Sequence, residues 1–170
     1  AYVDDLPTLE PIFSAKQDDG GVFTDYTAAA SVDTPDDVPL VPAAPVVGDA
    51  FYFGYQKPFN GVAIAITTAA TGDWSVLWEY WDGGAWQLFP DVKDATQSFH
   101  VIGELRVEVP VAPGDWATVA VDGTVAYWPR ARVAVVNATD VQPLAAKIKA
   151  LRPQRLTLES GTIAWAVRDW

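Results

Sequence analysis

The stretch that decides the fold is Trp78-Glu79-Tyr80-Trp81-Asp82-Gly83-Gly84-Ala85-Trp86, which joins three tryptophans to a tight turn. Strand alternation places Trp78 and Tyr80 on one face and Trp81 on the other. Asp82-Gly83-Gly84 supplies residues that adopt the positive φ of a short hairpin turn. The stretch therefore predicts a β-hairpin with aromatic rings on both faces. Such a hairpin either lies between two apolar layers or presents a ring to a ligand.

Short runs of β-branched and aromatic residues, separated by Gly, Asp, Asn and Pro, flank this hairpin on both sides. Many short strands with closely spaced turns are typical of an antiparallel β-sandwich of the jelly-roll or carbohydrate-module type. We therefore expect a mainly β fold. The expected strands span residues 50–55, 61–67, 74–81, 86–88, 104–109, 119–121 and 125–136.

The chain divides into three segments by composition. Residues 1–48 are rich in Asp, Pro, Ala and Thr, which predicts an extended acidic N-terminal arm with one short strand at 22–26. Residues 49–136 form the expected sandwich. In residues 137–170, Leu144, Ile148 and Leu151 share one helical face between Asp140, a good N-cap, and Pro153. This spacing predicts a C-terminal helix over 141–151, followed by two closing strands at 155–159 and 162–167.

The net charge of −11 is unevenly distributed. The first 50 residues hold ten acidic side chains and a single basic one, Lys16, whereas residues 130–170 are net basic. We expect attraction between these two regions, within one chain or between neighbours. A strongly negative protein repels phosphates, which argues against nucleic acid as a partner. No long apolar run and no basic-then-apolar start is present, so we expect neither a membrane span nor a signal peptide.

The sequence offers no convincing catalytic group. His100 is the only histidine, and Ser98, two residues before it, lacks a positioned acid and an oxyanion hole. Nothing fixes the separation of Glu79, Glu104 and Glu108 that glycosidase chemistry would need. We therefore expect a structural histidine, solvent-facing glutamates and no enzyme activity.

Metal and cofactor sites are also not expected. Asp18-Asp19-Gly20-Gly21 is rich in oxygen ligands but does not match the EF-hand loop. The chain has no cysteine, which excludes disulfides and thiolate ligands. It also lacks a phosphate-binding loop and a dinucleotide-binding fingerprint.

Four ordered blocks lie within residues 49–136: Asp49 to Tyr55 with Lys57-Pro58-Phe59 and Gly61, the hairpin 78–86, Pro113 to Trp116, and Gly123 to Val133. Together they resemble a β-sandwich module that recurs in tail, baseplate and appendage proteins of tailed bacteriophages and related prophage elements. Pro129 departs from this module, in which a β-branched residue is usual before the Arg-x-Arg strand. Because proline cannot donate to a strand ladder, we expect this strand to be bulged or at an edge.

The resemblance implies a structural or adhesive part of a virion, with no catalytic residue, and aromatic positions that determine the fold. Arg130 and Arg132 share one strand face, where we expect them to pair with Glu79 or to stack on an indole. The tryptophans expected to join the two sheets in the core are Trp78, Trp116 and Trp128.

These observations predict a non-enzymatic virion structural protein that decorates the head surface or forms part of the neck, tail or baseplate. It would assemble in the host cytoplasm and leave in the extracellular particle. Its partners would be other capsid or tail subunits in a homo-oligomer or symmetric array, with no nucleic acid or membrane. The arm would cross onto a neighbour by strand addition and bury Phe13, Phe23 and Tyr26 there.

The alternative is a carbohydrate-binding module for host adhesion. Aromatic rings beside carboxylate and amide groups form the usual platform for sugars. The candidate platform for a host glycan is Trp81, Asp82, Trp86 and Gln87. In the competing interpretation, these rings are covered by the arm or by a neighbouring subunit.

Overall fold

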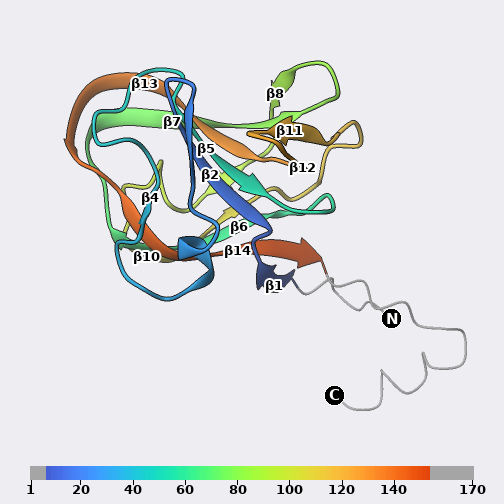
Figure 1. Ribbon diagram of the computed structural model, residues 1–170, viewed down its shortest axis with the longest axis horizontal. Coiled ribbons are helices and arrows are strands. Elements are labelled where there is room, and N and C mark those ends of the chain that lie inside the picture. Colours follow the sequence, from blue (N-terminus) through green and yellow to red (C-terminus); the bar gives the residue numbers. More distant parts are fainter. Residues whose placement is uncertain (1–6, 154–170) are drawn as a thin grey trace, which may run out of the picture.

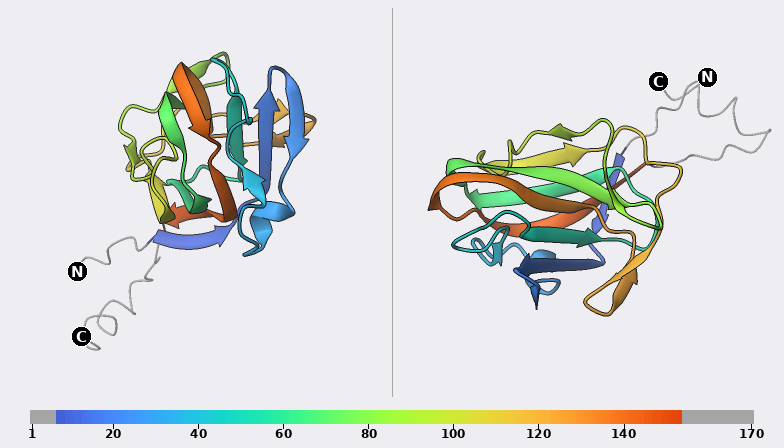
Figure 2. Two further views of the ribbon diagram at one scale, coloured as in Figure 1. Left: turned by 90° about the vertical axis from the view of Figure 1, so that its left-hand side faces the viewer. Right: turned by 90° about the horizontal axis from the view of Figure 1, so that it is seen from above.

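The computed structural model describes residues 7–153, which form two antiparallel sheets that face each other (Figures 1 and 2). The first, sheet A, has the order β1-β14-β6-β10-β9, and β4 also pairs with β14. Its strands are β1 (Pro7–Pro11), β14 (Leu144–Pro153), β6 (Gly61–Thr68), β10 (Gly103–Glu108), β9 (Lys93–Asp94) and β4 (Val38–Pro39).

The second, sheet B, has the order β3-β2-β5-β13-β7-β8. Its strands are β3 (Val22–Asp25), β2 (Ser14–Asp19), β5 (Ala50–Gly54), β13 (Arg130–Val141), β7 (Thr71–Trp81) and β8 (Trp86–Leu88). A separate hairpin joins β11 (Val119–Val121) to β12 (Thr124–Ala126), and one 3₁₀ turn, η1, spans Ala29–Ser31. No helix within residues 7–153 is long and apolar enough to cross a membrane.

The main core lies between the two sheets. Phe51, Phe53 and Trp78 point inward from sheet B, and Ile64 and Ile148 belong to strands of sheet A. The rings of Phe53 and Trp78 stack with centroids 5.5 Å apart. Successive side chains of a strand point to opposite faces, so the outward residues of these strands remain for other contacts, and in β5 they are buried as well.

A second cluster occupies the outer face of sheet B, under the β11–β12 hairpin. Trp128 is fully buried there and packs edge-on against Tyr52, with centroids 6.2 Å apart. Its indole Nε1 donates to the carbonyl of Val119 at 3.0 Å. The expectation that Trp128 joins the two sheets is therefore wrong, because this ring joins sheet B to the hairpin. Trp78 and Trp116 do lie in the main core.

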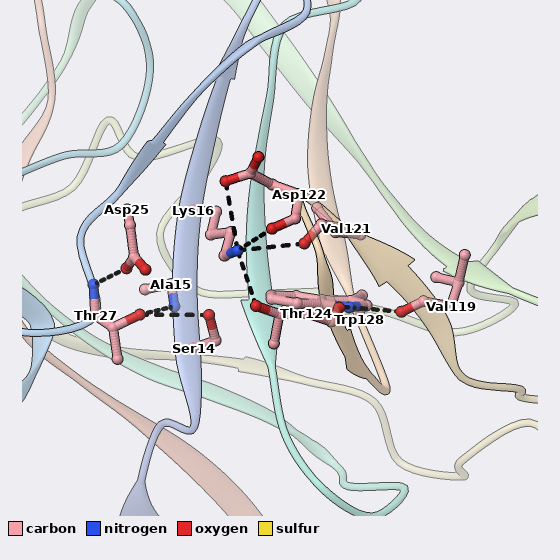
Figure 3. Close-up of polar contacts among 10 residues, drawn as sticks. All are labelled: Ser14, Ala15, Lys16, Asp25, Thr27, Val119, Val121, Asp122, Thr124 and Trp128. Carbon is pink, nitrogen blue, oxygen red and sulfur yellow. Dashed lines mark hydrogen bonds and ion pairs between the residues drawn. The ribbon is translucent and has the colours of Figure 1, made fainter.

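Lys16 of β2 reaches the turn of the same hairpin and fixes it with hydrogen bonds (Figure 3). Its side chain is 4% exposed, and Nζ donates to the carbonyl of Asp122 and to the hydroxyl of Thr124, both at 2.9 Å. The Asp122 carboxylate lies 3.5 Å away and balances part of the charge. A buried ammonium is tolerated when such partners replace its water shell.

Residues 7–48 do not form an extended arm. β2 lies between β3 and β5, and β1 pairs with β14 along residues 7–11. Val38, Leu40 and Val41 are buried in the proline-rich part of the segment. The predicted arm is thus wrong for the described residues, because their backbone groups pair with strands of the same chain.

The predicted C-terminal helix is also wrong. Its residues lie in β14, which pairs with β6 and β1. A register shift between Ala145 and Ile148 places two residues of β14, Ala146 and Lys147, opposite one residue of β6, Ala65. This bulge changes the alternation locally. Ile148 belongs to the main core, whereas Leu144 is only half-buried and Leu151 is buried outside that cluster, so the three residues of the expected helical face do not share one side of the strand. The closing strands expected at 155–159 and 162–167 lie outside the described residues.

The remaining strand predictions are confirmed to within three residues, except that 125–136 divides into β12 and β13. The hairpin of residues 78–86 is confirmed as β7 and β8, with Trp81 opposite Trp86. Pro129 lies just before β13, where its carbonyl accepts from the amide of Phe53. β13 is not an edge strand, since it pairs with β5 and β7, but it is bulged beyond Val133.

Candidate functional site

The four platform residues do lie together at the β7–β8 hairpin. The rings of Trp81 and Trp86 meet edge to face, 5.5 Å apart at 66°. Asp82 Oδ1 accepts from the amides of Gly84 and Ala85, both at 2.8 Å, and Oδ2 accepts from Gln87 Nε2 at 3.0 Å. These amide hydrogen bonds, first that from Gly84, lower the pKa of Asp82. The carboxylate therefore closes the turn.

A charge network continues from Trp86 across the outer face of sheet B. Glu79 is 6% exposed, and its Oε1 accepts from Nε of Arg130 at 2.9 Å and from Nε of Arg132 at 2.8 Å. Arg130 also lies over the Trp86 ring, 4.1 Å from its centroid. Both arginines pair with Glu79 as expected, and Arg130 also stacks on an indole, whereas the expectation of a solvent-facing Glu79 is wrong.

Two pKa values are shifted in this network. The hydrogen bond to Glu79 raises the pKa of Arg132. Burial raises the pKa of Tyr52, whose hydroxyl accepts from Arg130 at 3.1 Å. Both shifts favour the state that the side chain already has at neutral pH, the charged guanidinium of Arg132 and the neutral phenol of Tyr52.

This arrangement is a poor platform for a sugar. Arg130 covers one face of Trp86, and the 66° angle between the two rings prevents both from stacking on one extended glycan. The carboxylate and amide that would bind hydroxyl groups bond to each other and to the turn. The geometry suits a rigid hairpin better than an open binding site.

The three residues expected to contact a neighbour have different surroundings. Tyr26 packs against the main core and stacks on Phe51, 6.5 Å away. Phe23 packs on Tyr52 at 5.8 Å, at the edge of the outer cluster. Phe13 is 40% exposed. Phe13 thus presents the most open of the three rings, while Phe23 and Tyr26 help to hold residues 7–48 on their own domain.

His100 is placed by backbone groups and an aromatic ring. Its Nε2 lies 3.2 Å from the carbonyl of Gly72, and its ring is 4.8 Å from that of Trp74. Ser98 Oγ accepts from the amide of Val76 at 3.1 Å, on the open edge of β7. Both side chains therefore support the loop that closes this edge.

The acidic residues are used in turns and ion pairs. Asp18 Oδ1 accepts from the amide of Gly21, and Asp49 Oδ1 accepts from that of Gly20, so both close the β2–β3 turn. Within residues 7–153, no group of three or more His, Cys, Asp or Glu side chains has a metal-binding arrangement.

The four sequence blocks within residues 49–136 converge in space at Trp116. Its ring packs against Phe59 at 5.4 Å, Tyr80 at 6.5 Å and Tyr127 at 5.7 Å, one residue from each of the other blocks. Tyr55 and Tyr127 also form an isolated antiparallel bridge. The blocks thus form one continuous aromatic unit.

Sequence reasoning missed the buried role of Lys16 and a groove lined by Arg106 and Lys149 on sheet A. The alternation of Lys147, Ile148 and Lys149 could have indicated the groove had the segment been assigned to a strand. Comparison of the sequence with protein-family models and with curated proteins gives no match.

Proposed function

We propose that this protein is a non-enzymatic structural subunit of a tailed phage or phage-like particle, built on a β-sandwich module. The observation that supports it is the convergence of the four blocks at Trp116, because one ring contacts an aromatic residue from each of the others. If the aromatic residues of the four blocks determine the fold of such a module, they are expected to pack against one another. The subunit would decorate the head surface or belong to the neck, tail or baseplate.

The contacts with neighbouring subunits need surfaces other than the predicted arm, because residues 7–48 already pair with their own sheets. The edges of sheet B are β3 and β8, and both carry exposed apolar side chains: Val22 is 70% exposed and Leu88 is 55% exposed. Edge strands can add a strand from a neighbour. In a symmetric array, many such modest contacts would act together.

The test is to find the chain in particles. Particles released from the source culture would be purified on a density gradient, and the chain would be quantified in each fraction by mass spectrometry. We expect the chain to peak with the particles, and immunogold labelling to place it on the head, neck, tail or baseplate. A chain that stays at the top of the gradient while particles band below would overturn the proposal.

Host-glycan binding at the hairpin is an added function that the same preparation can test. Trp86→Ala would be compared with the wild type on a glycan array and by tryptophan fluorescence. Because Trp86 is covered by Arg130 and Asp82 closes the turn, we expect no glycan to give a signal that depends on Trp86.

A further inference from the structure

A groove of about 160 Å³ lies on the outer face of sheet A, over β6, β10 and β14, and Leu9 of β1 also lines it. Figure 1 shows these three strands at the lower side of the molecule. Its floor consists of the small side chains of Ala63 and Ala65 on the middle strand. Longer side chains on the two flanking strands form the walls, so the hollow follows directly from the alanines.

Two cations lie on either side of Ala63 in one row across the sheet. Arg106 of β10 is the Cα partner of Ala63 on one side, and Lys149 of β14 is its partner on the other. With strands about 4.8 Å apart, the two backbones are about 10 Å apart. Within residues 7–153, neither cation forms an ion pair.

The other end of the groove is close to neutral. Glu104 of β10 is the partner of Ala65, and the bulge in β14 brings Lys147 to the same end. Lys147 Nζ lies 3.6 Å from the carboxylate of Asp33. Glu108, two residues from Arg106 on the same strand, lies beyond the cationic end. The positive charge is thus concentrated over Ala63.

We propose that this groove binds a small molecule that carries a phosphate or carboxylate group, with the oxyanion over Ala63 between Arg106 and Lys149. Arg106 offers a planar fork of donors that matches the oxygens of such a group, and Lys149 adds a mobile ammonium. The alanine floor leaves the space that the oxyanion fills. This inference is independent of the proposed role in a particle.

The net negative charge of the protein restricts where an oxyanion can bind. A chain of net charge −11 repels oxyanions in general, so binding requires a local concentration of cations. The volume of about 160 Å³ equals about five water molecules, which is enough for one oxyanion and a few attached atoms. A large acidic polymer would extend beyond it, toward the carboxylates at both ends.

Inorganic phosphate is the probe. Amide chemical shifts of the ¹⁵N-labelled full chain would be followed during a phosphate titration, with chloride at equal ionic strength as the reference. We expect saturable shifts confined to residues around 63–65, 104–106 and 147–149. Arg106→Gln and Lys149→Gln should each raise the dissociation constant about tenfold, because a hydrogen bond to a charged group contributes about that factor.

Two matched pairs of variants separate the groove from general charge effects. Lys57→Gln removes an exposed cation elsewhere and should leave the dissociation constant unchanged. Ala63→Leu fills the floor with both cations kept and should abolish saturable binding, while Ala120→Leu, on exposed β11, should not. The spectra themselves report whether each variant is folded.

Weak, non-saturating shifts that Lys57→Gln reduces as much as Arg106→Gln would overturn the proposal. So would self-association, seen by sedimentation, that Arg106→Gln abolishes in a chain that does not bind phosphate. In that case, acidic side chains of a second copy would occupy the groove. Neither result depends on whether the chain is part of a particle.

Discussion

Glu79 is the residue on which the outer face of sheet B depends, since its carboxylate bonds to both Arg130 and Arg132. Glu79→Gln would leave two neighbouring guanidinium groups without their shared counter-charge. We expect the free energy of unfolding to fall by about 2–3 kcal/mol, somewhat less than for a fully buried pair because the Arg132 side chain is 27% exposed. Urea denaturation followed by tryptophan fluorescence measures this.

The matched control is Glu104→Gln, which removes an exposed carboxylate from β10. Its effect should stay within about 0.5 kcal/mol. Equal losses in both variants would mean that the Glu79 network contributes nothing specific.

Tyr52 makes the stability of the protein sensitive to alkaline pH. Burial raises its pKa in the folded state above the ordinary value of 10.0, so folding favours the neutral phenol. This contribution to stability is fully present below the unfolded pKa, near 10, and is lost as the pH rises through the higher folded pKa. The wild type should therefore lose stability relative to Tyr52→Phe above about pH 10.

The measurement is a set of urea denaturation curves for both proteins between about pH 8 and 11. Tyr55 and Tyr80 also have raised pKa values through burial, so both proteins will lose some stability at high pH. The prediction concerns the difference between them. A difference that stays constant across this range would contradict it.

At the scale of elements, the contact of β5 with Trp128 limits the size of residue 54. A Cβ on Gly54 would lie 2.6 Å from an atom of the Trp128 ring, which is fully buried and held by hydrogen bonds from its Nε1. Gly54→Ala should lower the free energy of unfolding by about 1–3 kcal/mol, as overpacking does. Thermal and urea denaturation measure the loss.

Gly114→Ala provides the control, because a Cβ at Gly114 meets no atom within 4 Å. We expect its effect to stay within about 0.5 kcal/mol. If both glycine variants were equally stable, the ring of Trp128 would have to move easily, in conflict with its packing.

Because residues 144–153 form a strand, neighbouring side chains point to opposite faces and should differ in their tolerance of a charged substitution. Ala150 is fully buried toward the core, whereas Lys149 faces outward over sheet A. Ala150→Asp should prevent folding, because it buries an unpaired carboxylate at a cost of several kcal/mol. Lys149→Asp should fold.

Circular dichroism and the dispersion of amide signals distinguish the two outcomes. In the helix expected from the sequence, Ala150 lies off the apolar face of Leu144, Ile148 and Leu151 and would tolerate Asp. A folded Ala150→Asp would therefore contradict the strand.

At the scale of the whole molecule, the two sheets connect distant parts of the sequence. β1 pairs with β14, so residues 7–11 meet residues 149–153. Closing such long loops is slow, and proteins dominated by distant contacts fold on the order of milliseconds to seconds. We expect refolding from urea in this range in stopped-flow fluorescence. Refolding complete within microseconds would contradict the topology.

The features that the sequence could predict are those that depend on contacts between residues close together in the chain. The hairpin at Asp82 depends on neighbouring residues, and its turn and its two strands were predictable. Lys16 of β2 was not, since its acceptors lie more than one hundred residues away. A buried lysine in an acidic, proline-rich segment looks like part of a solvated arm until those acceptors are known.

β14 shows a different limit. Ala-Ala-Lys-Ile-Lys-Ala has high helix propensity, and the bulge between Ala145 and Ile148 changes the strand alternation. Only the free edge of β6, which needs a partner for its backbone groups, selects the strand. The grouping of the four platform residues was predictable because they are neighbours in sequence. The covering of Trp86 by Arg130 was not, because Arg130 lies far away along the chain.

The pairing of β1 with β14 also bears on how the protein is made. A ribosome releases the N-terminal end of a chain first and covers the most recent residues in its exit tunnel. β1 therefore waits, with part of sheet A unfinished, until residues 149–153 have left the tunnel. The strand edges that β1 and β14 cover in the finished sheet are unpaired during this time, and unpaired strand edges are prone to aggregation.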